Sequence, residues 1–97
     1  MEFRKGILFI RLKGDLNKNT IRGIIDKDFK YIVLNIDDMY SIDNYSIKYL
    51  NKIYKQYEEK NNKFIICDKF SVSSKLLKDI PKINREYDAF KLFERMI

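Results

Sequence analysis

Histidine is absent from this sequence, and cysteine and glycine are scarce, with one and three residues among 97. Without histidine, imidazole acid–base catalysis, Ser-His-Asp triads and most zinc or non-haem iron sites are excluded. The single cysteine, Cys67, cannot form an internal disulfide, which suits a reducing cytoplasm. The glycines, at positions 6, 14 and 23, form neither a Gly-x-Gly-x-x-Gly nor a Gly-x-x-x-x-Gly-Lys phosphate loop. These absences argue against an enzyme, and we predict no cofactor and no metal.

Long apolar segments are also missing. The longest apolar runs, such as 7–10 and 31–34, contain four residues, whereas a membrane-spanning helix needs roughly 20. Residues 1–6 carry neither the apolar segment nor the cleavage site of a signal peptide. We therefore expect a cytoplasmic protein that does not enter a membrane.

The composition is that of a folded globular domain. Apolar residues make up 45% and charged residues 35% of the chain, which is not the balance of a disordered segment. There is no internal repeat or linker, so we predict one domain over residues 1–97. The formal net charge of +6 raises the possibility of a nucleic-acid partner. The lysines are scattered among acids, however, and this disfavours a basic binding patch.

The most informative segment spans residues 31–50. Its apolar residues 31–36 predict a strand, residues 37–43 a loop, and the following pattern a helix over about residues 44–60. Asp43 is the predicted N-cap, because its carboxylate can accept the free N–H groups of the first turn. Asn61 or Asn62 can adopt the left-handed conformation that stops a helix. The apolar face of this helix should carry Ile47, Leu50, Ile53, Tyr54 and Tyr57. Its polar face should carry Lys48, Asn51, Lys52, Lys55, Glu58 and Glu59.

Other strands are expected near residues 2–4, 7–13, 63–67 and Ile83. Other helices are expected near residues 19–27, 73–80 and 88–96. Asn17, Asn19 or Thr20 can cap the first of these helices, and Pro81 should end the second.

This order of elements predicts an α/β domain. Strands that alternate with helices need crossover connections, and these produce mostly parallel pairing. We predict a mixed, mostly parallel sheet of four to five strands flanked by four helices. The core should include Ile10, Leu34, Ile36, Leu50, Ile65 and Phe90. Cys67 should be a buried strand residue.

Three segments resemble the STAS domain, the fold of bacterial anti-sigma factor antagonists and of the cytoplasmic tail of sulfate transporters. Residues 14–17 read Gly-Asp-Leu-Asn and precede Thr20, similar to the family's Gly-(Glu/Asp)-Leu-Asp-x-x-Thr. Residues 31–50 align without a gap to the family's strand, loop and helix. Residues 63–68, with the Leu76-Leu77 pair, resemble the next strand and helix. The resemblance implies a STAS fold and a protein-binding role in transcription regulation.

The resemblance also implies a docking site in residues 37–48. In the family, a serine or threonine in Asp-Ser-(Ser/Thr)-Gly-x-Gly is phosphorylated by a GHKL-type kinase that is also the anti-sigma factor. Here Tyr45 stands at the acceptor position, and Ser46 and Lys48 replace the two glycines. We predict that the serine switch is degenerate, with Ser46 as the remaining phosphorylation candidate. The predicted partner-binding residues are Asn17, Ser41, Asp43, Asn44, Tyr45, Ser46 and Lys48.

Other interpretations stay open. The chain could be a small basic nucleic-acid-binding protein with aromatic side chains on an open sheet face, although Phe9, Tyr31 and Phe64 each lie in an apolar run that the core would claim. It could also be a ligand-binding or transporter-accessory STAS-like domain. Tyr45 could pack on Tyr49, four residues along the helix, in place of a partner. Lys48, Lys52 and Lys55 could form a solvated face or the footprint of an acidic partner.

Overall fold

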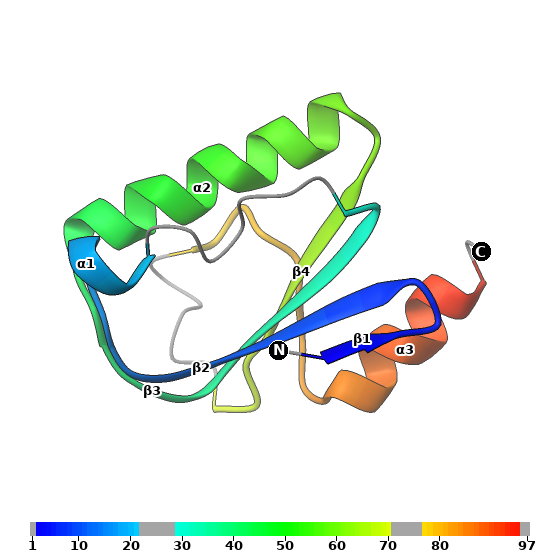
Figure 1. Ribbon diagram of the computed structural model, residues 1–97, viewed down its shortest axis with the longest axis horizontal. Helices are drawn as coiled ribbons and strands as arrows, with labels where there is room; N and C mark the ends of the chain where they lie inside the picture. Colours follow the sequence, from blue (N-terminus) through cyan, green and yellow to red (C-terminus); the bar gives the residue numbers. More distant parts are fainter. Residues whose placement is uncertain (1, 22–28, 71–76, 96–97) are drawn as a thin grey trace.

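One five-stranded sheet organises the computed structural model, which describes residues 2–21, 29–70 and 77–95 (Figure 1). The strands are β1 (Glu2–Arg4), β2 (Ile7–Leu16), β3 (Tyr31–Ile42), β4 (Lys63–Cys67) and β5 (Lys82–Ile83), and they lie in this order in the sheet. The β1–β2 pair is antiparallel and the other three pairs are parallel. The predicted mixed, mostly parallel sheet is therefore confirmed.

Three helices lie in the described part of the chain: α1 (Lys18–Ile21), α2 (Asn44–Glu59) and α3 (Glu86–Glu94). The bounds of α2 agree with the sequence, and Asn61 adopts the left-handed conformation after its end, with a φ of 59°. Residues 22–27 of the helix predicted at 19–27 lie outside the described residues, as do residues 73–76 of the helix predicted at 73–80.

The described part of that last helix corrects the sequence prediction. Residues 77–80 form turns and bends, and the Ile80 N–H donates to the Leu77 carbonyl oxygen at 3.2 Å. A proline disfavours the helical conformation in the residue before it, and Pro81 follows Ile80 directly. The prediction that Pro81 marks a boundary is correct, but residues 77–80 directly before it do not form the predicted helix.

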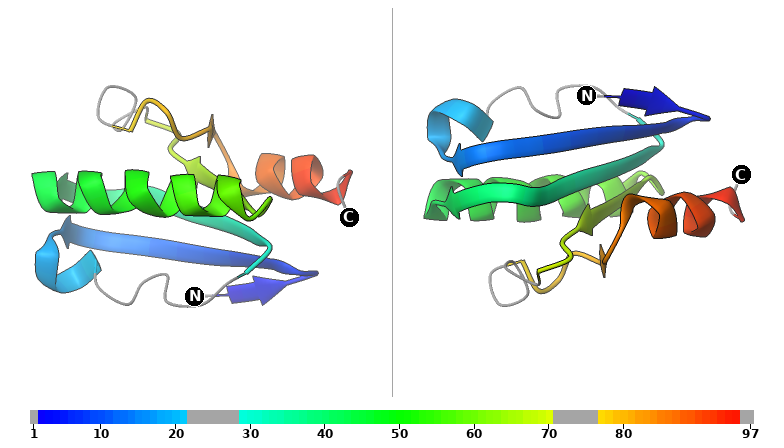
Figure 2. Two further views of the ribbon diagram at one scale, coloured as in Figure 1. Left: turned by 90° about the horizontal axis from the view of Figure 1, so that it is seen from above. Right: turned by 90° about the horizontal axis from the view of Figure 1, so that it is seen from below.

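Both faces of the sheet are covered, because alternate strand residues point to opposite sides. On one side α2 packs over the buried residues Leu8, Ile10, Ile32, Leu34, Phe64 and Ile66. On the other side α3 packs over Ile7, Phe9, Tyr31, Val33, Ile65 and Cys67. Figure 2 shows the two helices on opposite faces.

Most of the predicted core is confirmed. Ile10, Leu34, Ile36, Leu50 and Ile65 are buried, whereas Phe90 is only partly buried. Cys67 is a buried strand residue, and burial raises the pKa of its thiol to about 12. A thiol with so high a pKa is not an activated nucleophile. No helix within the described residues is long and apolar enough to cross a membrane.

The neighbouring strands β2 and β3 are longer than the sequence predicts. β3 continues through Ile42 where a loop was expected over 37–43, and β2 continues to Leu16. The two extensions pair with each other through shifts in register after Arg11 and after Gly14, where the φ is 74°. A bulge adds a residue to one strand and breaks its alternation of apolar and polar side chains. The period-two signal of a strand is therefore interrupted in this part of the sequence.

A polar contact also joins the start of α3 to the sheet. The carboxylate of Glu86, the first residue of α3, accepts hydrogen bonds from Arg11 Nε at 2.9 Å and Arg11 Nη2 at 2.6 Å. It also accepts one from Asn35 Nδ2 at 2.7 Å. The remaining guanidinium nitrogen of Arg11 donates to Glu2 at 3.1 Å. A single guanidinium thus joins β1, β2 and α3.

The Arg11–Glu86 pair makes stability depend on pH. Hydrogen bonding from Arg11, with a further bond from Asn35, holds the pKa of the Glu86 carboxyl below its ordinary value of 4.5. A carboxyl with a lowered pKa in the folded state stabilises the fold above its unfolded pKa. That stabilisation is lost as pH falls through the folded pKa.

Replacement of Glu86 by glutamine should therefore destabilise the protein at pH 7, because the charge-assisted bonds to Arg11 are lost. We expect a loss of about 1 kcal/mol, discounted because Arg11 is partly solvated. The difference between wild type and variant should shrink as pH falls below about 4. Thermal unfolding measured across this pH range tests both effects.

Asp88→Asn is the matched control. Asp88 also lies in the first turn of α3, but it pairs with Arg85, whose side chain is 71% exposed. Such an exposed pair contributes little to stability. Equal losses from the two substitutions would mean that a first-turn carboxylate, and not the contact with Arg11, is what matters.

Candidate functional site

β2 and β3 end side by side, and α1 and α2 begin there (Figure 1). Asp43 stands between the last residue of β3 and the first residue of α2. One of its carboxylate oxygens accepts from the Ser46 N–H at 2.8 Å, and the other accepts from the Lys18 N–H at 3.2 Å. Its own N–H donates to the Leu16 carbonyl oxygen at 3.0 Å. The predicted N-cap is confirmed, and the same carboxylate also holds the start of α1.

Asn17 plays the corresponding part for α1. Its side-chain oxygen accepts from the N–H groups of Asn19 at 2.9 Å and Thr20 at 3.3 Å. The Thr20 hydroxyl in turn accepts from the Asn17 N–H at 2.8 Å. This reciprocal capping satisfies backbone donors that a helix start leaves free. Of the three candidate caps predicted for this helix, Asn17 is the one that the structure uses.

Ser41 is bound into the same junction from β3. Its hydroxyl donates to the carboxylate of Asp15 at 2.7 Å, and the Asp15 carbonyl oxygen accepts from the Thr20 hydroxyl at 3.1 Å. The polar residues of the 14–20 motif are therefore structural: they fix how β2 turns into α1. The hydrogen bond to Asp15 also fixes the position of Ser41, which is exposed.

The carboxylate of Asp43 is held in its charged form. The Ser46 side chain and backbone N–H, followed by the Lys18 N–H, hold the pKa of Asp43 below its ordinary value of 3.8. The Ser46 hydroxyl lies outside hydrogen-bonding geometry with any described residue. The hydrogen bonds at this cap are therefore those from the two backbone N–H groups.

Ser46 is fully buried, with an exposed fraction of 0%. It lies in the first turn of α2, where a small side chain lets the helix start close to the sheet. A kinase would have to open this turn to reach the hydroxyl. Phosphorylation of Ser46 therefore stays a prediction, and it requires a different conformation of the helix start.

Tyr45 is 41% exposed, next to the capped helix start. Its ring stacks on Tyr49 with centroids 6.4 Å apart, and Lys18 Nζ lies 6.0 Å from the ring centre. The sequence allowed Tyr45 to pack either on Tyr49 or on a partner, and the structure shows the packing on Tyr49. It covers one side of the ring, so a partner could still contact the rest.

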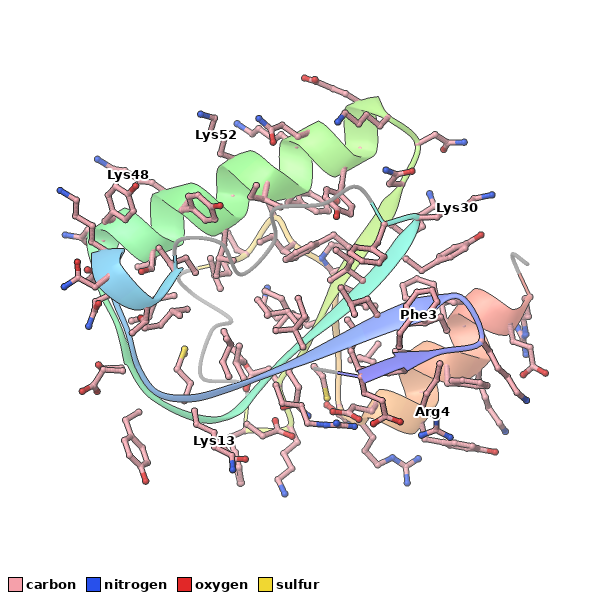
Figure 3. All side chains as sticks on the ribbon, viewed as in Figure 1. Phe3, Arg4, Lys13, Lys30, Lys48 and Lys52 are labelled. Atoms are coloured by element: carbon pink, nitrogen blue, oxygen red, sulfur yellow. The ribbon has the colours of Figure 1, made fainter. Side chains whose placement is uncertain are left out.

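The structure brings most of the predicted site residues together. Asn17, Ser41, Asp43, Asn44, Tyr45 and Ser46 all belong to the junction or adjoin it, and Lys48 follows one turn into α2. Lys48 points away from the sheet (Figure 3). Lys18 and Asp15 were not predicted. The one signal in the sequence was that Asp15 lies within the 14–17 motif and Lys18 directly follows it. Their partners, Ser41 and Asp43, lie 26 and 25 residues away, so no local pattern indicates the two contacts.

The three strand aromatics considered from the sequence do not form a platform for nucleic-acid bases. Phe9, Tyr31 and Phe64 are 3–5% exposed and belong to the two cores. Base stacking needs exposed ring faces beside basic residues. As the sequence predicts, the core takes these rings.

Comparison with solved structures agrees with the predicted fold. The structure of the anti-sigma factor antagonist SpoIIAA in its unphosphorylated form matches with a TM-score of 0.74. The match covers 100% of this chain and 96% of that chain, at 14% sequence identity. No family model matches the sequence. The chain therefore has a STAS-like fold, as its three motifs predict.

Loss of the Asp43 carboxylate should loosen two helices at once. In Asp43→Ala, amide hydrogen exchange should accelerate at both Ser46 and Lys18, because both N–H groups lose their acceptor. The thermal midpoint should fall by on the order of 5 °C. Asparagine is also a good N-cap, so Asp43→Asn should keep the Ser46 amide protected. Exchange measured by NMR on the labelled protein tests this.

Ser41→Ala serves as the control. It removes a neighbouring hydrogen bond to Asp15 and leaves the Asp43 carboxylate in place. Unchanged exchange at Lys18 in Asp43→Ala would contradict the inferred link between α1 and α2.

Proposed function

We propose that this chain is a non-enzymatic protein–protein interaction module of the anti-sigma factor antagonist type. Its partner would be an anti-sigma factor, and a GHKL-type kinase is the class implied by the sequence motifs. Binding would release a sigma factor and so regulate transcription in the cytoplasm. The likeness in fold to an anti-sigma factor antagonist supports this class of function.

The observation that carries the proposal is the exposure of Tyr45 on a rigid support. Asp43 and Asn17 cap the two helix starts beside it, so the backbone under the ring is already ordered. Aromatic side chains in such positions are frequent binding hot spots, because they bury a large area while few rotatable bonds become fixed. A partner that covers the exposed part of the ring would also contact Asn44 and Lys48, which are exposed.

We expect docking to be independent of serine phosphorylation. Tyr45 occupies the position of the family's acceptor hydroxyl, and a tyrosine ring carries that hydroxyl several ångströms further from the backbone. The neighbouring Ser46 hydroxyl is buried. A phosphate of roughly −1.5 to −2 charges could not be added there without opening the first turn of α2.

The docking surface can be tested with Tyr45→Ala. The first partner to test is a GHKL-type kinase whose gene neighbours the gene for this chain. Its affinity is measured by calorimetry. We expect the substitution to weaken binding about tenfold or more, as loss of an aromatic hot spot does. The thermal midpoint should change by no more than about 3 °C, since Tyr45 is partly exposed.

Tyr87→Ala is the matched control, because Tyr87 is an exposed tyrosine on α3, on the opposite face of the sheet. It should bind like the wild type. Equal binding by wild type, Tyr45→Ala and Asp43→Ala would show that this end of the domain is not the interface.

The state of the switch can be read separately by intact-mass analysis after incubation with the same kinase and ATP. We expect no added phosphate, because the acceptor position holds Tyr45 and Ser46 is buried. If a phosphate appears, Ser46→Ala and Tyr45→Phe identify the acceptor. A phosphate lost only in Ser46→Ala would show that α2 opens at its first turn and that the switch has moved by one residue.

A further inference from the structure

The exposed face of α2 carries three lysines in a row. Lys48, Lys52 and Lys55 are spaced by four and three residues, so they span about 10 Å along one side of the helix. All three are exposed, and none forms an ion pair with another residue in the described segments. Figure 3 shows Lys48 and Lys52 projecting away from the sheet. We call these three residues the α2 lysine row.

Lys55 lies four residues before Glu59, a spacing that stabilises a helix, but helix stability does not account for Lys48 and Lys52. Lys48 and Lys52 are like charges four residues apart, an arrangement that destabilises a helix. The helix dipole favours acids near the N-terminus and bases near the C-terminus. In α2 the first turn has no acid and the last turn has no base, and Glu58 and Glu59 lie at the C-terminal end. The charges thus run against the preference of the helix, which points to a role outside folding.

The α2 lysine row adjoins the surface proposed for docking. Tyr45 stacks on Tyr49, and both rings come from the first two turns of α2. Lys48 directly precedes Tyr49 in the chain, and Lys52 follows it by three residues. From α1, Lys18 Nζ approaches the Tyr45 ring to 6.0 Å. A partly exposed aromatic pair is therefore bordered by lysines on two elements. This is the composition of an interface with an aromatic centre and a charged rim.

We infer that the α2 lysine row binds an acidic patch on the protein partner, whose carboxylates would lie beside the site that receives Tyr45. The inference rests on the proposed docking function and names the chemistry of the partner's surface. Complementary charges at the rim of an interface speed association and select the correct partner.

The residues between the lysines favour a protein over other anionic partners. Asn51 lies between the lysines and Gln56 directly follows Lys55, and both can donate to or accept from the side chains and backbone of a protein. A membrane-binding helix would need exposed apolar residues on this face. A protein can place separate carboxylates beside the lysines alone, whereas the continuous phosphate backbone of a nucleic acid would also meet the carboxylate of Glu59 at the end of the row and be repelled there.

Lys48→Glu separates binding from folding, because the two effects have opposite signs. The substitution removes the repulsion with Lys52 and places an acid near the N-terminus of α2. The thermal midpoint should therefore rise by about 2–5 °C. Binding to an acidic probe should weaken about fivefold. The probe is a fluorescein-labelled peptide of alternating Glu and Ala, about 12 residues long, titrated with the full chain at about 50 mM salt.

Lys91→Glu is the matched control. It makes the same change in net charge on α3, where Lys91 is exposed and lies in the last turn. Its binding of the peptide should stay within about twofold of wild type, and its thermal midpoint should not rise. Equal weakening by both variants would mean that net charge, and not the α2 lysine row, attracts the peptide, and would overturn the inference.

Two further probes separate the classes of partner: a thymidine oligonucleotide of equal length, and vesicles with about 30% phosphatidylserine. Tighter binding of either than of the peptide, lost in Lys48→Glu, would replace the acidic protein by a nucleic acid or a membrane. If the peptide does not bind but Tyr45→Ala still weakens binding of the kinase, the proposed function stands and only the charge of the partner's surface is wrong.

Discussion

The carboxylate of Asp43 is the contact on which the candidate site depends. It accepts one N–H from the first turn of α2 and one from α1, while the Asp43 backbone is bound to the end of β2. Two helix starts and two strand ends are therefore fixed relative to one another by a single residue. Because its pKa is lowered, the charged form that binds both helix starts persists to a lower pH than it would in an ordinary aspartate. Because Tyr45 and Lys48 lie in the first turns of α2, this junction also determines where they are placed.

What could be predicted from the sequence follows the range of the interactions. The bounds of α2, the cap at Asp43 and the left-handed Asn61 rest on contacts within a few residues, and all three are present. The extension of β3 through residue 42 depends on register shifts against β2, which leave no periodic signal. The contact of Glu86 with Arg11 joins residues 75 apart in the chain. No local pattern of residue types can indicate such a pairing.

The same distinction applies within the site. Alignment to a known motif located residues 43–48 at a helix start, and the structure agrees. It could not show that Ser46 is buried, because burial depends on how closely the first turn of α2 packs against the sheet. Nor could it show that Lys18 reaches Asp43 and the Tyr45 ring, since that contact requires α1 and α2 to begin side by side. The position of these residues at a helix start could be predicted from the sequence, whereas the burial and contacts of their side chains could not.

The cap at Asp43 also explains how α2 tolerates its own charges. A carboxylate at the N-cap places negative charge where the helix dipole is positive, and it satisfies the backbone N–H of Ser46. This stabilisation offsets part of the unfavourable effect of Lys48 and Lys52 in the turns that follow. The buried face, with Leu50 and Tyr57, contributes the larger share through packing. Because the cap and the core stabilise α2, its exposed face can carry a charge pattern that does not itself stabilise the helix.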